Sequence, residues 1–488
     1  MFRNRAVVVG AGPNGLAAAI VLARAGMDVT VFEAESEAGG ATRSAPVFGP
    51  GTIVDLGSAA HPLGVSSPFL RSLDLERHGL RWIHPDIPAA HPLEDRPAAL
   101  LHASLDRTAA ELGRDGRSWR WLLGSSVRHW DRLTETLLGP LVRIPRDPLV
   151  LGDFGVCAVA PATALARLAF SDEPARALFA GCAAHSFVPL HHPLTSAFGL
   201  LLAAAAHSRG WPVAQGGSRA IARALVAELE AHGGRVVTDH PVADLAELGP
   251  ADLTLLDIGP RAALDLLGDR LPSRVARAFR AWRYGPSAHK VDYLLDGPVP
   301  WTDERVGGAG TVHLGGTMAE IAEAESLVAQ GRHPERPYVL LCQQSVADAT
   351  RVPPGQQVVY AYAHTPRASA DPATGQRIDA QIERFAPGFR DRILARVETP
   401  PAALERFDRN LVDGDIIGGS IIGTQQVLRP RATLQPYSLG VPGVFLCSAS
   451  TPPGGGVHGM SGYHAARAAL ASLHRGSRDR SAGGRVGE

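Results

Sequence analysis

The first fifty residues alternate between short apolar runs and one longer stretch of small apolar residues. The runs at 6–10 and 28–32 have the length of buried strands, and the alanine-rich stretch between them has the length and composition of a helix. Gly10, Gly12 and Gly15 separate the first run from that stretch. The order predicts a strand, a tight turn, a helix and a second strand, which together form a βαβ unit.

Further along the chain the pattern changes twice. Residues 67–209 are largely helical in pattern, and apolar side chains recur at helical spacing between 119 and 141. An apolar stripe of this kind is typical of a core helix, and it is interpreted as one. Because arginines flank the stripe, a membrane-surface helix is the alternative. Within 264–415 the pattern turns to alternation, which predicts a mixed or antiparallel sheet. The alternating segments are 290–295, 338–343 and 357–364, and further buried strands are expected at 235–238, 253–257 and 443–447.

Composition narrows the classes of function. Lys+Arg and Asp+Glu are equal at 48 each, so the formal net charge is zero and binding to nucleic acid is not predicted. The four cysteines are scattered without a C-x-x-C pair, and we expect neither disulfide-reductase chemistry nor a metal site. No apolar run reaches about 18 residues, so no transmembrane helix is expected. The first strand begins close to Met1, which predicts no signal peptide, and the sparse cysteines favour a cytoplasmic location.

The three glycines form a G-x-G-x-x-G fingerprint in its expected context, which predicts a dinucleotide site. Gly10 permits the turn, Gly12 lets backbone approach a pyrophosphate, and Gly15 lets the helix pack on the sheet. The helix N-terminus attracts the phosphates. Glu33, at the end of the second strand, is placed to accept hydrogen bonds from an adenosine ribose and would repel a 2′-phosphate.

A chain of 488 residues is expected to form two domains. The fold class predicted is α/β, with a Rossmann-type nucleotide-binding domain interwoven with a substrate domain of mixed or antiparallel sheet plus helices. The nucleotide-binding domain is predicted to comprise 1–66, 210–262 and 416–474, the substrate domain 67–209 and 263–415, and a disordered tail 475–488.

A second glycine motif narrows the ligand. Gly39 and Gly40 precede Arg43, and this segment resembles the second glycine motif of flavoproteins of the glutathione-reductase and amine-oxidase type. An NAD dehydrogenase has no need of it, so FAD is favoured over NAD.

Further segments carry a wider resemblance, over essentially the whole chain except the tail. They are 55–62, 215–218, 348–355, 386–388, 429–437 and the glycine-rich turn 450–459. Together they resemble the phytoene-desaturase-like group of FAD-dependent oxidoreductases, which has the fold of the amine oxidases. The branch that the chain resembles in detail contains the pyridine nucleotide-disulfide oxidoreductase domain flavoproteins rather than the true carotenoid desaturases. Pro452 departs from the family pattern, which has His there.

The resemblance implies FAD as the cofactor, with the turn 450–459 against the flavin and the following helix N-terminus stabilising negative charge on the reduced ring. Together, the fingerprint and the resemblance predict the following cofactor-binding residues: Gly10, Gly12, Pro13, Asn14, Gly15, Glu33, Gly40, Thr42, Arg43, Gly57, Ser58, Ala59, Val242, Ser448, Ser450, Gly456, Val457 and His458.

Three side chains are candidates for catalysis. Lys290 lies in an alternating strand that resembles the amine-oxidase strand whose lysine holds a water at flavin N5; the alternative is a lysine that reaches the surface. His61 is a candidate proton carrier or covalent flavin link, or else a turn histidine. His458 faces flavin or substrate, or supports the residues that do. His185, His191 and His192 lack the carboxylate or cysteine neighbours of a metal site and are interpreted as loop lining.

The predicted function is that of an FAD-dependent oxidoreductase. It would desaturate an apolar, polyene- or lipid-like small molecule by hydride transfer to flavin N5. The sequence has one dinucleotide fingerprint, so no separate NAD(P)H-binding domain is expected. Electrons are therefore expected to leave the flavin for O₂, a quinone or a protein acceptor. The alternatives are an amine-type oxidase using O₂, a redox-neutral polyene isomerase and a low-turnover flavoprotein scaffold. Peripheral membrane contact stays open.

Overall fold

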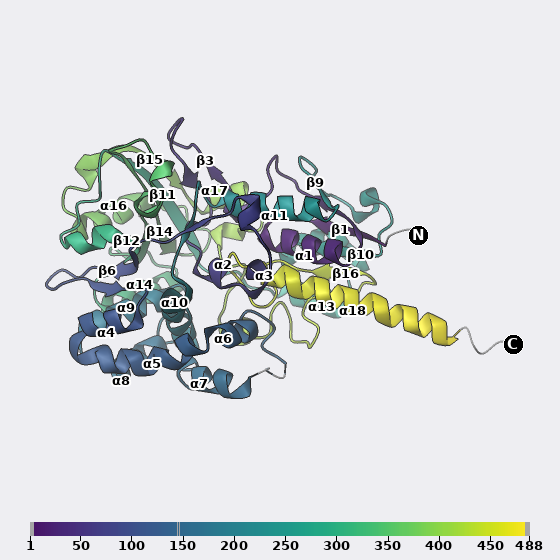
Figure 1. Ribbon diagram of the computed structural model, residues 1–488, viewed down its shortest axis with the longest axis horizontal. Coiled ribbons are helices and arrows are strands. Elements are labelled where there is room, and N and C mark those ends of the chain that lie inside the picture. The colour runs from purple at the N-terminus through teal and green to yellow at the C-terminus, as the bar shows by residue number, and fades with distance from the viewer. Residues whose placement is uncertain (1–3, 144, 146, 484–488) are drawn as a thin grey trace.

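Two sheets and a layer of helices make up the molecule (Figure 1). The structure is a computed structural model that describes residues 4–143, 145 and 147–483. In Figure 1 the smaller sheet lies near the N-terminus, the larger sheet lies at the opposite end, and the helical layer lies beside the larger sheet. The α/β class expected from the sequence is therefore confirmed.

The smaller sheet is parallel throughout, in the order β16-β10-β1-β2-β9. Its strands are β1 (Arg5–Val9), β2 (Asp28–Phe32), β9 (Arg235–Val237), β10 (Leu253–Leu256) and β16 (Val444–Leu446). Helices cover both faces, which explains why these strands are continuous apolar runs. One face carries α1 (Pro13–Arg24), α11 (Arg219–Ala231) and α18 (Met460–Gly483), and the other α12 (Pro260–Leu267) and α13 (Ser273–Arg280).

The last helix differs from the sequence expectation. α18 continues to Gly483, so the part of the tail at 475–483 that we predicted to be disordered is helical. The yellow helix in Figure 1 extends beyond the sheet that its first turns cover. The remaining predicted tail residues, 484–488, lie outside the described residues.

The larger sheet has the order β15-β11-β14-β13-β12-β6-β7 and is antiparallel except where β12 meets β6. Its strands are β6 (Ile87–His91), β7 (Ala99–Leu101), β11 (Ser287–Leu295), β12 (Ala309–Leu314), β13 (Val339–Cys342), β14 (Gln357–Thr365) and β15 (Ile393–Thr399). Side chains alternate between its faces. One face packs on α16 (Thr374–Phe385), and the other faces the helical layer.

Three of these strands, β6, β7 and β15, were not predicted. We expected 67–209 to be largely helical, but β6 and β7 lie within it and extend the larger sheet. Every residue of both strands is buried. Because both faces of these strands are covered, their polar and apolar residues do not alternate. In addition, β6 contains Pro88 and two alanines, which are not typical of strands.

The helical layer covers the inner face of the larger sheet. It consists of α4 (Leu105–Glu111), α5 (Gly116–Arg128), α6 (Trp130–Leu137), α7 (Pro148–Ala158), α8 (Ala162–Ala169), α9 (Glu173–Ala184) and α10 (Thr195–Arg209). The predicted stripe forms α5 and α6, and Trp119, Leu123, Trp130 and Leu133 are core residues. No single helix among the described residues is long and apolar enough to cross a membrane; α7 and α8 pass that test only together, with a 92° bend between them.

The remaining strands and α-helices lie outside the two sheets and the helical layer. They are the ribbons β3 (Ser44–Ala45) with β4 (Val54–Asp55) and β5 (Trp82–Ile83) with β8 (Val213–Ala214), and the helices α2 (Pro62–Ser66), α3 (Pro68–Arg71), α14 (Met318–Ala329), α15 (Gln344–Ala347) and α17 (Pro401–Phe407). The chain crosses between the sheets several times, and residues from distant segments meet there.

Candidate active site

A cavity of about 610 Å³ begins at the carboxyl ends of β1 and β2 and reaches the inner face of the larger sheet. Its volume lies in the usual range for a small-molecule site. The carboxyl ends of parallel strands are where open α/β sheets bind ligands. We call the end near β1 the nucleotide end and the end between the helical layer and the larger sheet the chamber.

The glycine fingerprint is held by close backbone contacts at the nucleotide end. Gly10 has a φ of +98°, and a Cβ there would lie 2.8 Å from the Asp257 carbonyl oxygen. A Cβ at Gly15 would lie 2.0 Å from the Gly10 carbonyl oxygen. Glycine is therefore required at both positions. Gly10 is required by its backbone conformation and its contact with Asp257, and Gly15 by its contact with the turn.

Glu33 and Arg43 line the same end. The Glu33 carboxylate is 8% exposed and accepts the Ala11 N–H at 2.7 Å, so it is fixed beside the fingerprint turn. The Arg43 guanidinium donates to the Gly40 and Phe407 carbonyl oxygens and pairs with Glu35 at 3.2 Å. A carboxylate and a cation thus line the same end of the cavity.

The glycine-rich turn before α18 lines the cavity between its two ends. The Ser448 and Ser450 hydroxyls bond each other at 2.7 Å. His458 accepts the Met460 N–H on Nδ1 at 3.0 Å, so its proton lies on Nε2, which is buried and has no partner within the described residues. Burial lowers the pKa of His458 to about 4, and its ring is neutral.

The structure brings nearly all predicted cofactor-binding residues together. All of them line the cavity except Gly15, which lies beneath it and donates its N–H to the Asp257 carboxyl at 2.8 Å. The residues that line it are Gly10, Gly12, Pro13, Asn14, Glu33, Gly40, Thr42, Arg43, Gly57, Ser58, Ala59, Val242, Ser448, Ser450, Gly456, Val457 and His458.

His61 lines the cavity at the start of α2, and its tautomer follows from its partner. The Ser218 hydroxyl donates to the Ser58 carbonyl oxygen at 2.6 Å, so it accepts from His61 Nε2–H at 2.8 Å. The second ring nitrogen, Nδ1, is then a bare acceptor, buried without a partner in the described part of the chain. Burial lowers the pKa of His61 to about 4.

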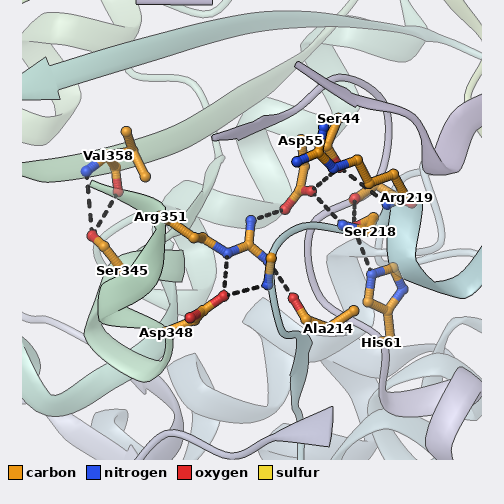
Figure 2. Close-up of polar contacts among 12 residues, drawn as sticks. Ser44, Asp55, His61, Ala214, Ser218, Arg219, Ser345, Asp348, Arg351 and Val358 are labelled. Carbon is orange, nitrogen blue, oxygen red and sulfur yellow. Dashed lines mark hydrogen bonds and ion pairs between the residues drawn. The ribbon is translucent and has the colours of Figure 1, made fainter. Parts of the chain in front are cut away.

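A buried ionic network holds Ser218 in place (Figure 2). Figure 2 shows the Arg351 guanidinium between the carboxylates of Asp55 and Asp348, at 2.6 and 3.2 Å. Asp55 also accepts the Ser218 N–H at 2.7 Å. Burial opposes ionisation of Asp55, but Arg351 and the donors from Ser218 and Ser44 lower its pKa overall. The network was not predicted, because its members are far apart in the sequence.

Lys290 is placed differently from the other two catalytic candidates. It does not line the cavity; it is buried, pairs with Asp292, and lies 4.6 Å from the ring centroid of Tyr360, which does line the cavity. Burial raises the pKa of Asp292. Lys290 is therefore one side chain removed from the space that holds His61 and His458.

Sequence reasoning missed several lining residues. Asp257 follows β10 directly, and its position at the carboxyl end of a parallel strand could have identified it. Burial raises its pKa to about 8, helped by Asp408 and Glu33. The chamber walls, including Phe187, Phe198 and Tyr362, come from helices and strands that gave no functional pattern.

The residues present fit a dinucleotide cofactor. The cavity carries buried polar atoms that have no partner within the described residues: Asn14 Oδ1, His61 Nδ1 and His458 Nε2. Buried polar groups are normally paired, so these atoms indicate a polar ligand between them. Asp257 would repel a pyrophosphate if ionised, but its raised pKa allows it to be protonated near neutral pH.

The sequence matches a nucleotide-binding domain family and resembles known oxidoreductases. Residues 8–73 match the model of the NAD(P)-binding Rossmann-like domain. The chain is 25% identical to pyridine nucleotide-disulfide oxidoreductase domain-containing protein 2 of Mus musculus, covering 96% of this chain and 93% of that protein. It is 28% identical to hydroxyneurosporene desaturase of Cereibacter sphaeroides, covering 97% and 99%.

Solved structures agree at the level of the fold. A triple mutant of putrescine oxidase superposes with a TM-score of 0.60 at 17% identity, over 97% of this chain and 99% of that one. At this identity the likeness shows the fold alone.

Proposed function

We propose that this chain, an FAD-type oxidoreductase, belongs to the phytoene-desaturase-like group, binds FAD and dehydrogenates an apolar small molecule. The observation that carries the proposal is the continuity of the cavity from the fingerprint to the chamber. When bound, FAD supplies the hydride acceptor for such a reaction.

The nucleotide end supplies the groups that would hold the cofactor. The partial positive charge at the N-terminus of α1 and the Arg43 guanidinium would attract the phosphates. Glu33 offers acceptor oxygens to a ribose. The turn at 448–458, nearer the chamber, would hold the reactive half.

The chamber supports dehydrogenation by its chemistry. Phe187, Phe198 and Leu202 make it apolar, so it excludes water from the reacting carbon atoms. Dehydrogenation also releases a proton from substrate. His61 is the residue placed to accept it, because Nδ1 is a bare acceptor whose orientation is fixed through Ser218.

An amine substrate is less well supported. A protonated amine in an apolar site is best stabilised by a carboxylate; the aromatic rings that line the chamber, such as Tyr360 and Tyr362, also attract a cation but do not neutralise its charge. The carboxylates that line the described cavity, Glu33, Glu35, Asp257 and Asp408, belong to the nucleotide end or the turn beside it, not to the chamber. Lys290, the residue that would favour amine oxidation, does not line the cavity.

Anaerobic mixing tests the proposal and separates the two candidates. Purified protein loaded with FAD is mixed with a panel of apolar isoprenoids and a panel of primary amines, and the visible flavin band is followed. The proposal predicts bleaching by members of the isoprenoid panel, with recovery when oxygen or a quinone is admitted. Bleaching by amines alone would favour the amine oxidase, and bleaching by neither panel would contradict both.

A further inference from the structure

The chamber is apolar except at a few side chains. Its wall includes Phe187, Phe198, Leu202 and Leu340. Some polar groups on the wall are already engaged within the protein, such as the Tyr360 hydroxyl, which donates to the Gly57 carbonyl oxygen at 2.9 Å. A few precisely placed polar groups in an apolar pocket are what usually fixes the orientation of a ligand.

His185 is the most informative of these polar side chains. It follows α9, lines the chamber and is partly exposed. Its Nε2 lies 3.0 Å from Nε2 of His313, a fully buried residue of β12. Both rings are neutral, because burial lowers the pKa of His185 to about 3 and lowers that of His313 well below its ordinary value. One ring must therefore donate and the other accept.

The direction of that hydrogen bond follows from the other nitrogen of His313. His313 Nδ1 is buried and has no partner in the described chain. A buried N–H without an acceptor is rarer than a buried acceptor without a donor. His313 therefore carries its proton on Nε2 and donates it to His185. His185 then carries its own proton on Nδ1, which is left as a donor for the chamber.

Trp211 adds a second donor beside His185. Its ring centroid lies 5.8 Å from that of His185, and it also lines the chamber. The Trp211 indole N–H forms no hydrogen bond with the described residues, and indole nitrogen can only donate. Two unused donors thus lie together on a wall that is mostly apolar but also carries the Tyr362 hydroxyl, and the described residues that line the chamber include no carboxylate to receive them.

We propose that the substrate is an apolar molecule that carries a neutral oxygen acceptor, a hydroxyl or carbonyl group, and that His185 and Trp211 bind this oxygen. His313 is the positioning residue that fixes the proton of His185. The inference rests on the proposed function only in taking the chamber as the substrate site.

A matched set of ligands tests the inference. Geraniol, its aldehyde geranial and the hydrocarbon 2,6-dimethylocta-2,6-diene share one carbon skeleton and differ in the terminal oxygen. Dissociation constants are measured from intrinsic tryptophan fluorescence, with the flavin content recorded separately. Wild-type protein is expected to bind both oxygen compounds at least about tenfold more tightly than the hydrocarbon, equivalent to about 1.4 kcal/mol. Geranial accepts but cannot donate, so it should bind as tightly as geraniol.

Variants show which side chains produce the preference for the ligands that contain oxygen. His185→Phe should reduce the preference to about threefold, the part that Trp211 supports, while binding the hydrocarbon as tightly as wild type, which also shows that the chamber is intact. His191→Phe, at an exposed histidine outside the cavity, should keep the preference. Trp211→Phe removes the indole donor but keeps an aromatic, apolar side chain, and should reduce the preference about threefold; it serves as the test if His185→Phe does not fold.

Three results would overturn the inference: equal binding of the three ligands to wild type, an undiminished preference in His185→Phe, or geranial binding like the hydrocarbon. A protein that holds no flavin yet shows the oxygen preference would contradict the proposed function and leave this inference standing.

Discussion

Burial, more than specific partners, determines the charge of the ionisable side chains around the cavity. It lowers the pKa values of His61 and His458 to about 4 and raises that of Asp257 to about 8. The rings are therefore neutral, and each offers one donor or one acceptor in a direction fixed by its neighbours. A site of this kind suits hydride transfer from an uncharged substrate.

Asp257 gives a prediction at this scale. Its pKa in the folded protein is about 8 against an ordinary value of 3.8, so the folded protein holds a proton that the unfolded chain releases between about pH 4 and pH 8. Stability from this group is therefore full below that window and is lost as the pH rises through it. Asp257→Asn keeps an acceptor for the Gly15 N–H but cannot ionise.

We expect the two proteins to melt alike near pH 4 and Asp257→Asn to become progressively the more stable of the pair up to pH 8.5. Thermal melts without added cofactor measure this. Groups common to both proteins cancel in the difference. A difference in melting temperature that does not change with pH would show that Asp257 is not protonated in the fold.

At the scale of elements, the contact between α1 and the fingerprint turn depends on the absence of a side chain. A Cβ on Gly15 would lie 2.0 Å from the Gly10 carbonyl oxygen, and neither backbone segment is free to move. Gly15→Ala should therefore lower the free energy of unfolding by about 3 kcal/mol or more.

Gly124 is the matched control. It lies within α5, and a Cβ there would meet nothing within 4 Å, so Gly124→Ala should raise stability by up to about 1 kcal/mol through helix propensity. Chemical denaturation of both variants provides the measurement. If Gly15→Ala were as stable as wild type, the predicted close packing of α1 would be wrong.

The same scale shows what the sequence could and could not predict. β1, α1 and β2 were predicted because apolar runs, glycines and an acidic residue stand in one short segment. β6 was missed because a strand buried on both faces does not alternate. The chamber donor His185 was interpreted as loop lining, because its role depends on His313, which joins it only through the fold.

At the scale of the whole molecule, the buried network of Figure 2 joins segments that are distant in the sequence and lie outside the two large sheets. Arg351 follows β13 of the larger sheet, whereas Asp55 lies in β4 close to the fingerprint region. The network also orders Ser218 and, through it, His61. It therefore links the stability of the molecule to the geometry of the cavity.

Arg351→Gln should lower the free energy of unfolding by about 3–5 kcal/mol, because it leaves two buried carboxylates without their cation. Arg332→Gln, at an exposed arginine, should change stability by no more than about 0.5 kcal/mol. Urea unfolding at neutral pH measures both. Equal stabilities for the two variants would mean that the network contributes nothing to joining these segments.

The central claim is that the cavity holds FAD from the fingerprint to the chamber, and the flavin content of the protein tests it most directly. Protein purified and then incubated with FAD is desalted, and its visible spectrum is recorded alongside Glu33→Ala and the control Glu37→Ala. We predict bound flavin in wild type and Glu37→Ala, and at least about tenfold weaker retention in Glu33→Ala, since the buried acceptor is lost. A folded wild-type protein that retains no flavin, or equal retention in all three proteins, would contradict the account.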